Sequence, residues 1–138
     1  MRFDPQADVE FRIKLAREYF EDAEARLKGG DFIGCVQYSQ LAAENAAKAV
    51  IATKRVPSWT HDPSAELLQL LGDFPPEKRE RISRLAEISS KLAPEHGRTT
   101  YGEPEKFLTP KMLYDQNSAK EALELAREAL RLMSEILG

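Results

Sequence analysis

Two histidines are the side chains in this sequence best suited to chemistry near neutral pH. They are His61 and His96, and the 138 residues contain no other histidine and one cysteine, Cys35. Imidazole titrates near neutrality, so it serves as a general acid or base and as a metal ligand. The two histidines fall in separate segments between predicted helices, and the sequence does not require them to share a site. One cysteine and two separated histidines match no metal-ligand spacing, so we expect no metal ion and no cofactor.

Each histidine also has a purely local interpretation. Thr60, His61 and Asp62 together are suited to cap a short helix that begins at Ser64. His96 is equally well explained as a loop residue that faces water.

A polar stripe runs along an alanine-rich stretch, residues 38–49. Gln40, Glu44 and Lys48 recur every four residues, so one face of a helix carries all three side chains. Glu44 and Lys48 are an i, i+4 ion pair in the favourable order. We expect this stripe to have a structural role, fixing the register of the helix, and Lys48 to contact a ligand only secondarily.

The segment around Arg98 is the other candidate site. Arg98 and Tyr101 lie close in sequence to Lys91 and His96. Such a group could offer a cationic, aromatic pocket to a phosphate and a base. The alternative is a flexible loop whose charged residues face water. We predict nucleotide contacts at Arg98, Tyr101 and Lys48, and the catalytic candidates are Arg98 and His96.

Periodic apolar residues and helix-capping signals predict the elements that must position these side chains. Asp4-Pro5 and Asp62-Pro63 each resemble a cap followed by a proline at the first helical position, and glycines end two of the helices. Residues 93–113 contain three prolines and no sustained period, so we expect a long loop there with one helical turn at Pro110–Leu113. The predicted helices are Pro5–Lys28, Phe32–Lys54, Ser64–Leu71, Glu77–Leu92 and Asp115–Leu137.

The pattern predicts an all-α fold, because no segment alternates as a strand would. We expect one domain, residues 1–138, built as an up-and-down four-helix bundle with a short extra helix between its second and third helices. Apolar and small positions on two of the helices exceed what one bundle of this size needs. We therefore also expect a homodimer.

Composition limits the partners and the location. The net charge of −3 argues against DNA binding through the whole surface, although a local patch could still bind RNA or a nucleotide. No apolar run is long enough to span a membrane. A lone cysteine cannot form an internal disulfide, which favours a reducing, cytoplasmic location.

At the level of motifs, the chain resembles the HEPN family, the higher eukaryote and prokaryote nucleotide-binding domain. The segment 39–49, Ser-Gln-Leu-Ala-Ala-Glu-Asn-Ala-Ala-Lys-Ala, is similar to the family's Gln-x-Ala-x-Glu-x-x-x-Lys-Ala core. Thr60-His61-Asp62 with Leu67-Leu68 resembles its Thr-His-Asp element, and Tyr114-Asp115 its entry to the last helix. The resemblance covers nearly all of the chain.

The resemblance implies a helical bundle that usually dimerises, often as the partner of a minimal nucleotidyltransferase in a toxin–antitoxin pair. Many members cleave RNA with an arginine followed four to six residues later by a histidine. Here no histidine follows Arg98, and His96 precedes it by two residues. Some members instead carry an Arg-Tyr arrangement, to which Arg98 and Tyr101 could correspond.

Three functional hypotheses follow. The first is a dimeric nucleotide-binding or regulatory module that is the partner of a nucleotidyltransferase. The second is a metal-independent ribonuclease with a non-standard arrangement of Arg98 and His96. The third is a purely structural helical dimer. Whether the chain is an enzyme stays open at this point.

Overall fold

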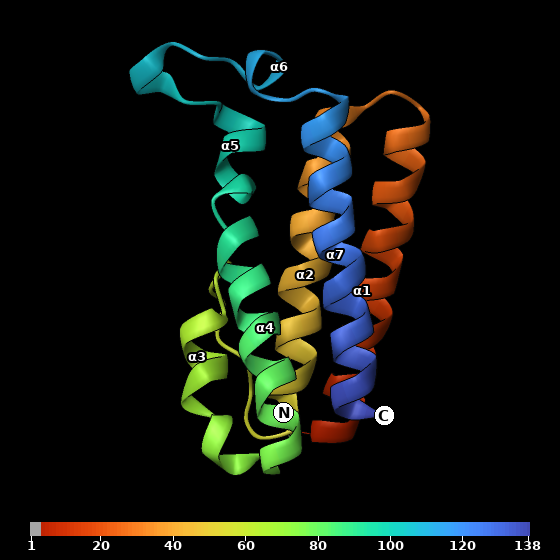
Figure 1. The fold of residues 1–138 in the computed structure, drawn as a ribbon, viewed down its shortest axis with the longest axis vertical. Helices are drawn as coiled ribbons and strands as arrows, with labels where there is room; N and C mark the ends of the chain where they lie inside the picture. The colour runs from red at the N-terminus through yellow and green to blue at the C-terminus, as the bar shows by residue number, and fades with distance from the viewer. Residues whose placement is uncertain (1–3) are drawn as a thin grey trace.

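The computed structural model describes residues 4–138, and helices account for most of them (Figure 1). The described residues contain no strand, and a single isolated bridge joins Glu103 to Leu108. The predicted all-α class is therefore confirmed. The helices are α1 (Pro5–Lys28), α2 (Phe32–Ala52), α3 (Ser64–Gln69), α4 (Pro76–Leu92), α5 (Glu95–Tyr101), α6 (Pro110–Leu113) and α7 (Gln116–Leu137), with 3-10 turns η1 (Leu71–Asp73) and η2 (Pro104–Lys106).

Side-chain caps explain where the three longest helices begin. Asp4 and Asp31 each accept a hydrogen bond from a backbone N–H in the first turn of α1 and α2. Asp115 and Ser118 form a reciprocal capping box at the start of α7. These caps satisfy backbone donors that have no partner inside the helix. The sequence predicted all three starts correctly.

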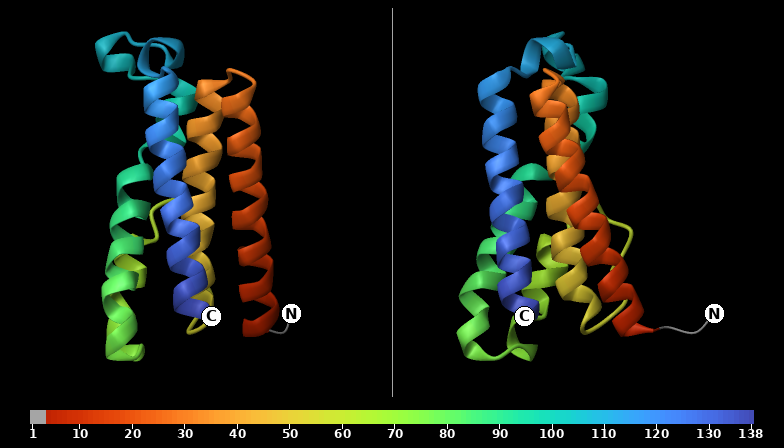
Figure 2. Two further views of the ribbon diagram at one scale, coloured as in Figure 1. Left: turned by 45° about the vertical axis from the view of Figure 1, so that its right-hand side comes forward. Right: turned by 90° about the vertical axis from the view of Figure 1, so that its right-hand side faces the viewer.

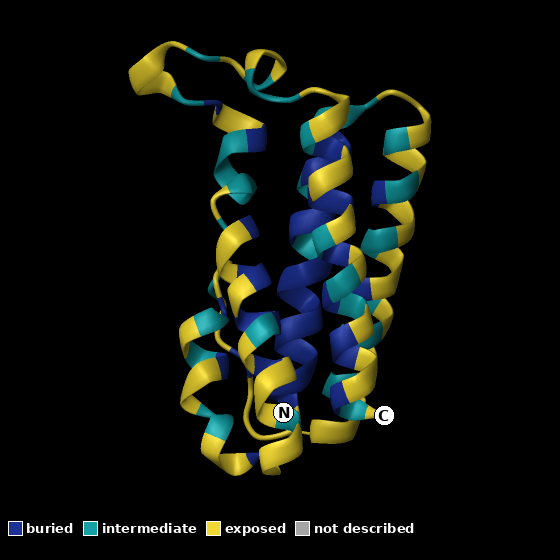
Figure 3. Ribbon diagram, in the orientation of Figure 1, coloured by how far each residue is buried: buried dark blue, intermediate teal, exposed yellow. Residues whose placement is uncertain are grey.

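Four long helices lie side by side, and successive ones run in opposite directions (Figures 1 and 2). α1 and α4 run one way along the long axis, while α2 and α7 run the other way. α2 packs against α1, α4, α5 and α7. It is the central helix, and it is buried along most of its length (Figure 3). Its many alanines let the neighbouring helices approach closely.

Residues at helical spacing on α1 and α7 face the interior of the protein. α1 packs on both α2 and α7, with Ala16 and Ala23 buried and Phe11 exposed. On α7, six residues at helical spacing are all buried. These positions are Ala119, Ala122, Ala126, Ala129, Met133 and Ile136.

The predicted long loop at 93–113 is wrong in its first part. Residues Glu95–Tyr101 form α5, which continues from the end of α4 after a break at Ala93-Pro94. Pro94 has no N–H, and the first turn of a helix needs none, so this proline can both end α4 and begin α5. The expected turn at Pro110–Leu113 is present as α6. Because α5 is helical, His96 and Arg98 have defined directions.

Candidate functional site

The polar stripe of α2 lies inside the protein. Glu44 and Lys48 are each 5% exposed, and Lys48 Nζ lies 3.1 Å from Glu44 Oε2. Gln40 Nε2 donates to the other carboxylate oxygen, Glu44 Oε1, at 3.1 Å. The i, i+4 pair expected from the spacing is therefore present. It is a buried pair within a hydrogen-bonded network, and a buried charge depends strongly on its partners.

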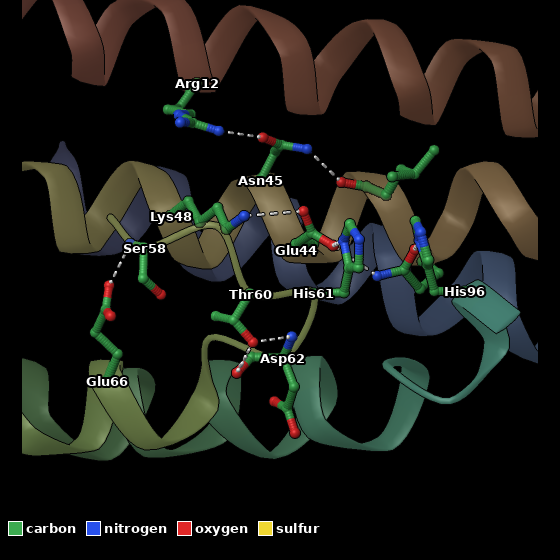
Figure 4. Close-up of polar contacts among 12 residues, drawn as sticks. Arg12, Glu44, Asn45, Lys48, Ser58, Thr60, His61, Asp62, Glu66 and His96 are labelled. Atoms are coloured by element: carbon green, nitrogen blue, oxygen red, sulfur yellow. Dashed lines mark hydrogen bonds and ion pairs between the residues drawn. The ribbon is translucent and has the colours of Figure 1, made fainter. Parts of the chain in front are cut away.

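The fold brings the two histidines together on this stripe (Figure 4). His61 Nδ1 lies 3.1 Å from Glu44 Oε1, and His96 Nδ1 lies 3.1 Å from Gln40 Oε1. Their rings stack, with centroids 3.6 Å apart and planes at 18°. His61 comes from the segment between α2 and α3, whereas His96 comes from α5. The sequence placed them in separate segments and carried no sign of this contact.

The expected cap of the short helix by His61 is not seen: α3 has Pro63 as its N-cap without a side-chain cap hydrogen bond, and Asp62 is the residue that contacts its first turn. Asp62 Oδ1 accepts hydrogen bonds from the backbone N–H of Ser64 at 3.1 Å and from its hydroxyl at 2.6 Å. The Thr60 hydroxyl bonds the backbone of Asp62. The His61 ring instead points toward Glu44 (Figure 4). Thr60 and Asp62 therefore hold the segment in the shape that presents His61 to α2.

The environment of His96 favours its neutral form. Burial lowers the pKa of His96 below its ordinary value of 6.5, and the neighbouring His61 and Lys48 act in the same direction. The negative charge of Glu44 opposes them in part. A neutral imidazole has a free lone pair, so His96 can accept a proton or bind a metal ion.

Arg98 lies in a second cluster that does not include His96. Its guanidinium bonds Glu95 and, through Nε at 3.0 Å, Glu103, and it lies over the ring of Tyr114 at 5.7 Å. The Tyr114 hydroxyl donates to Glu95. Burial and the Glu95 carboxylate raise the pKa of Tyr114. His96, two residues earlier on α5, contacts α2 instead, so the two catalytic candidates have different partners.

Arg98, Tyr101 and Lys48, the predicted nucleotide contacts, do not line one pocket. Lys48 lies in the core, and Tyr101 is 75% exposed. Arg98 and Lys91 do share a groove of about 270 Å³, together with Tyr114. The groove runs between the α4–α5 side and α7, and its walls include the apolar side chains Val36, Leu92, Leu113, Ala122 and Leu125.

Sequence reasoning missed Glu95 and Tyr114 as partners of Arg98. Glu95 stands three residues before Arg98, a spacing that puts the two on one helix face. An interpretation of this segment as a loop hides that signal. Cys35 is buried, and burial raises the pKa of its thiol.

The fold and these clusters define an all-helical bundle with a polar network on its central helix, and comparisons with known proteins give its family. The HEPN domain family matches residues 9–137, nearly the whole chain, and the chain therefore belongs to the HEPN family. It is also similar to the crystal structure of TT1696 from Thermus thermophilus. That similarity has a TM-score of 0.69 at 25% sequence identity, and it covers 92% of this chain and 96% of the other. No curated protein sequence matches this chain significantly.

Among residues 4–138, none of the helices combines the length and the apolar character needed to cross a bilayer.

Proposed function

We propose that this chain is a dimeric HEPN module that binds a nucleotide and regulates a nucleotidyltransferase partner, in a pair of the toxin–antitoxin type. The observation that carries the nucleotide part is the groove where Lys91, Arg98 and Tyr114 meet an apolar wall. Ligand pockets commonly combine a mostly apolar lining with a few well-placed polar groups. In this proposal the base lies against the apolar wall and the Tyr114 ring.

The two cations of the groove, Arg98 and Lys91, differ in whether a carboxylate neutralises them. Glu95 and Glu103 hold the Arg98 guanidinium in place and offset its charge. The ammonium of Lys91 has no ion-pair partner within residues 4–138. Lys91 also lines an adjoining groove together with Lys120. The phosphates are therefore bound chiefly by Lys91 and Lys120, while Arg98 is a preorganised donor. Lys48 and Tyr101 have no part in this version of the site.

Calorimetric titration with ATP, ADP, AMP and GTP tests nucleotide binding. We expect saturable binding, and we expect Lys91→Ala to weaken it about tenfold, which corresponds to one charge-assisted hydrogen bond of about 1.4 kcal/mol. Lys111→Ala removes the same charge from an exposed lysine outside the groove, so it should leave binding unchanged. If none of the nucleotides binds at millimolar concentration, or if Lys91→Ala binds like the wild type, the nucleotide part of the proposal is wrong.

The partner part needs a separate experiment. Co-expression with a nucleotidyltransferase encoded by a neighbouring gene should yield a complex that stays together through size-exclusion chromatography. Separate elution of the two proteins would contradict this part and leave the nucleotide part standing.

A ribonuclease is a second candidate function, and the stacked histidines favour it. His96 has a lowered pKa and suits a general base, whereas His61, with 55% of its side chain exposed, can meet a substrate and donate a proton. Two titratable groups in different environments are a common basis for acid–base catalysis. This version differs from the pairing of Arg98 with His96, because Arg98 belongs to the other cluster.

Incubation with tRNA and mRNA tests this candidate. If it is correct, His61→Ala and His96→Ala should each lower the cleavage rate about 100-fold, and Lys91→Ala should have little effect. Absence of cleavage by the wild type, or full activity in both histidine variants, would exclude it.

A further inference from the structure

Three potential metal ligands converge where the histidines meet α2. Glu44, His61 and His96 each offer one ligand atom, and these atoms all lie within 4.8 Å of one another. They come from α2, the segment before α3, and α5, which are distant in sequence but adjacent in the fold (Figure 4). We propose that these three side chains bind one divalent transition-metal ion, with Zn²⁺ as the best match. This inference does not depend on nucleotide binding.

The donor types select the class of metal. Two imidazole nitrogens and one carboxylate oxygen are a set that suits Zn²⁺, Co²⁺ and Ni²⁺, whereas Mg²⁺ and Ca²⁺ prefer oxygen ligands alone. Three protein ligands leave a fourth position of a tetrahedral ion for water or a bound molecule.

A second set of contacts already orients the ligands. Gln40 donates through Nε2 to Glu44, so its Oε1 faces His96 Nδ1 and accepts that proton. The lone pair of His96 is then on Nε2. Lys48 bonds Oε2 of Glu44 and leaves Oε1 on the side of the histidines. Outer hydrogen bonds of this kind fix the tautomer and the orientation of metal-binding histidines.

One ligand pair already has a suitable separation. His61 Nδ1 and Glu44 Oε1 are 3.1 Å apart, and two ligands of a tetrahedral zinc ion lie about 3.3 Å apart. A metal ion placed between these atoms replaces the hydrogen bond. Metal binding through Nδ1 requires the ring proton of His61 to be on Nε2.

Binding requires one movement, and the structure has a residue able to make it. The stacked rings must tilt apart so that their lone pairs converge on the ion. His61 has 55% of its side chain exposed and lies between helices, whereas Glu44 is held in the core. His61 is therefore the ligand that closes on the metal. The nearby Lys48 ammonium repels a cation, which lowers the affinity.

Metal uptake by tag-free protein, freed of metal with a chelator that is then removed, tests this proposal. The background is low, because the chain has two histidines in total and its one cysteine is buried. Titration with Co²⁺ should produce visible d–d absorption that saturates at one ion per chain, and Zn²⁺ should displace it. His61→Ala should abolish the absorption. Gln40→Ala should weaken binding about 10- to 100-fold.

Trp59 provides an independent readout. It is the one tryptophan of the chain, it is 96% exposed, and it stands two residues before His61. Co²⁺ or Ni²⁺ at the proposed site should quench its fluorescence, while Mg²⁺ should not. Asp73→Asn is the matched control, because it removes an exposed carboxylate that is not one of the three ligands, and it should behave as the wild type.

Two results would overturn the proposal. One is wild-type protein that gives neither saturable Co²⁺ absorption nor quenching. The other is a folded His61→Ala variant, verified by circular dichroism, that binds Co²⁺ as tightly as the wild type. If His61→Ala does not fold, NMR of the wild-type imidazole nitrogens decides: Zn²⁺ must shift the signals of both histidines, and unshifted signals contradict the site.

Discussion

At the scale of single residues, Glu44 is the junction of the site. Its buried carboxylate is in hydrogen-bonding contact with three side chains, those of Lys48, Gln40 and His61. A buried carboxylate that loses its cation keeps the cost of desolvation without the ion pair that offset it. The network therefore makes Lys48 important for stability even though a solvent-exposed i, i+4 pair contributes little.

We predict that Lys48→Met lowers the free energy of unfolding by about 3 kcal/mol, because it leaves Glu44 charged and buried. Urea unfolding followed by circular dichroism measures this. The double variant Glu44→Gln with Lys48→Met should lose less than Lys48→Met alone, since neither charge remains. Lys14→Met, a change at an exposed position of α1, should have little effect. A double variant less stable than the single one would contradict the explanation.

The lowered pKa of His96 predicts how stability depends on pH. Below about pH 6.5 the unfolded chain binds a proton on this histidine more readily than the folded protein does, so acidification favours unfolding. Stability should fall as the pH decreases from about 6.5 through the lower folded pKa. It should be insensitive to His96 above about pH 7.5.

Urea unfolding between about pH 7.5 and about pH 5 tests this against His96→Gln, which does not titrate. The wild type should lose more stability over this interval than the variant does. Parallel curves for the two proteins would mean that His96 carries no penalty for protonation.

At the scale of elements, the α5–α6 segment depends on one glycine. Gly102 ends α5 with φ of 66°, and a Cβ there would lie 2.1 Å from the carbonyl oxygen of Leu108. The bridge between Glu103 and Leu108 follows directly. This turn holds the segment that carries Glu103 close to Arg98.

We predict that Gly102→Ala lowers the free energy of unfolding by about 1–3 kcal/mol through backbone strain, with the steric clash adding to the loss. Gly97→Ala is the matched control on the same helix. A Cβ at Gly97 meets nothing within 4 Å, so this change should stabilise α5 by about 0.5–1 kcal/mol. Thermal unfolding measures both variants, and equal effects would contradict the role assigned to Gly102.

At the scale of the whole molecule, the surface available for a dimer interface differs from the one that the small residues of the sequence predicted. The small residues of α2 are covered by helices of the same chain, so they are not free to form an interface. The apolar side chains that stay exposed lie elsewhere, on α1, in the segments around α3 and at the α5–α6 end. They include Phe11, Trp59, Leu68, Tyr101, Phe107 and Met112.

HEPN domains commonly dimerise, and we predict that this chain does so as well. Light scattering should give twice the chain mass of 15.6 kDa, and dilution should shift the mass toward the monomer if the interface is small. A mass of one chain at all concentrations would contradict the prediction.

The sequence by itself determined the all-α class, most helix boundaries and the HEPN motifs, because caps, apolar periods and the i, i+4 spacing are local properties of the chain. It could not determine α5, because Pro94 is the same local signal whether it only ends a helix or also begins the next one. Tertiary structure alone decided that His61 and His96 stack, that Glu44 and Lys48 are buried, and that Arg98 pairs with Glu95 and Glu103. The path of residues 53–63 and the direction of α5 decide those contacts, and both depend on how the helices pack together.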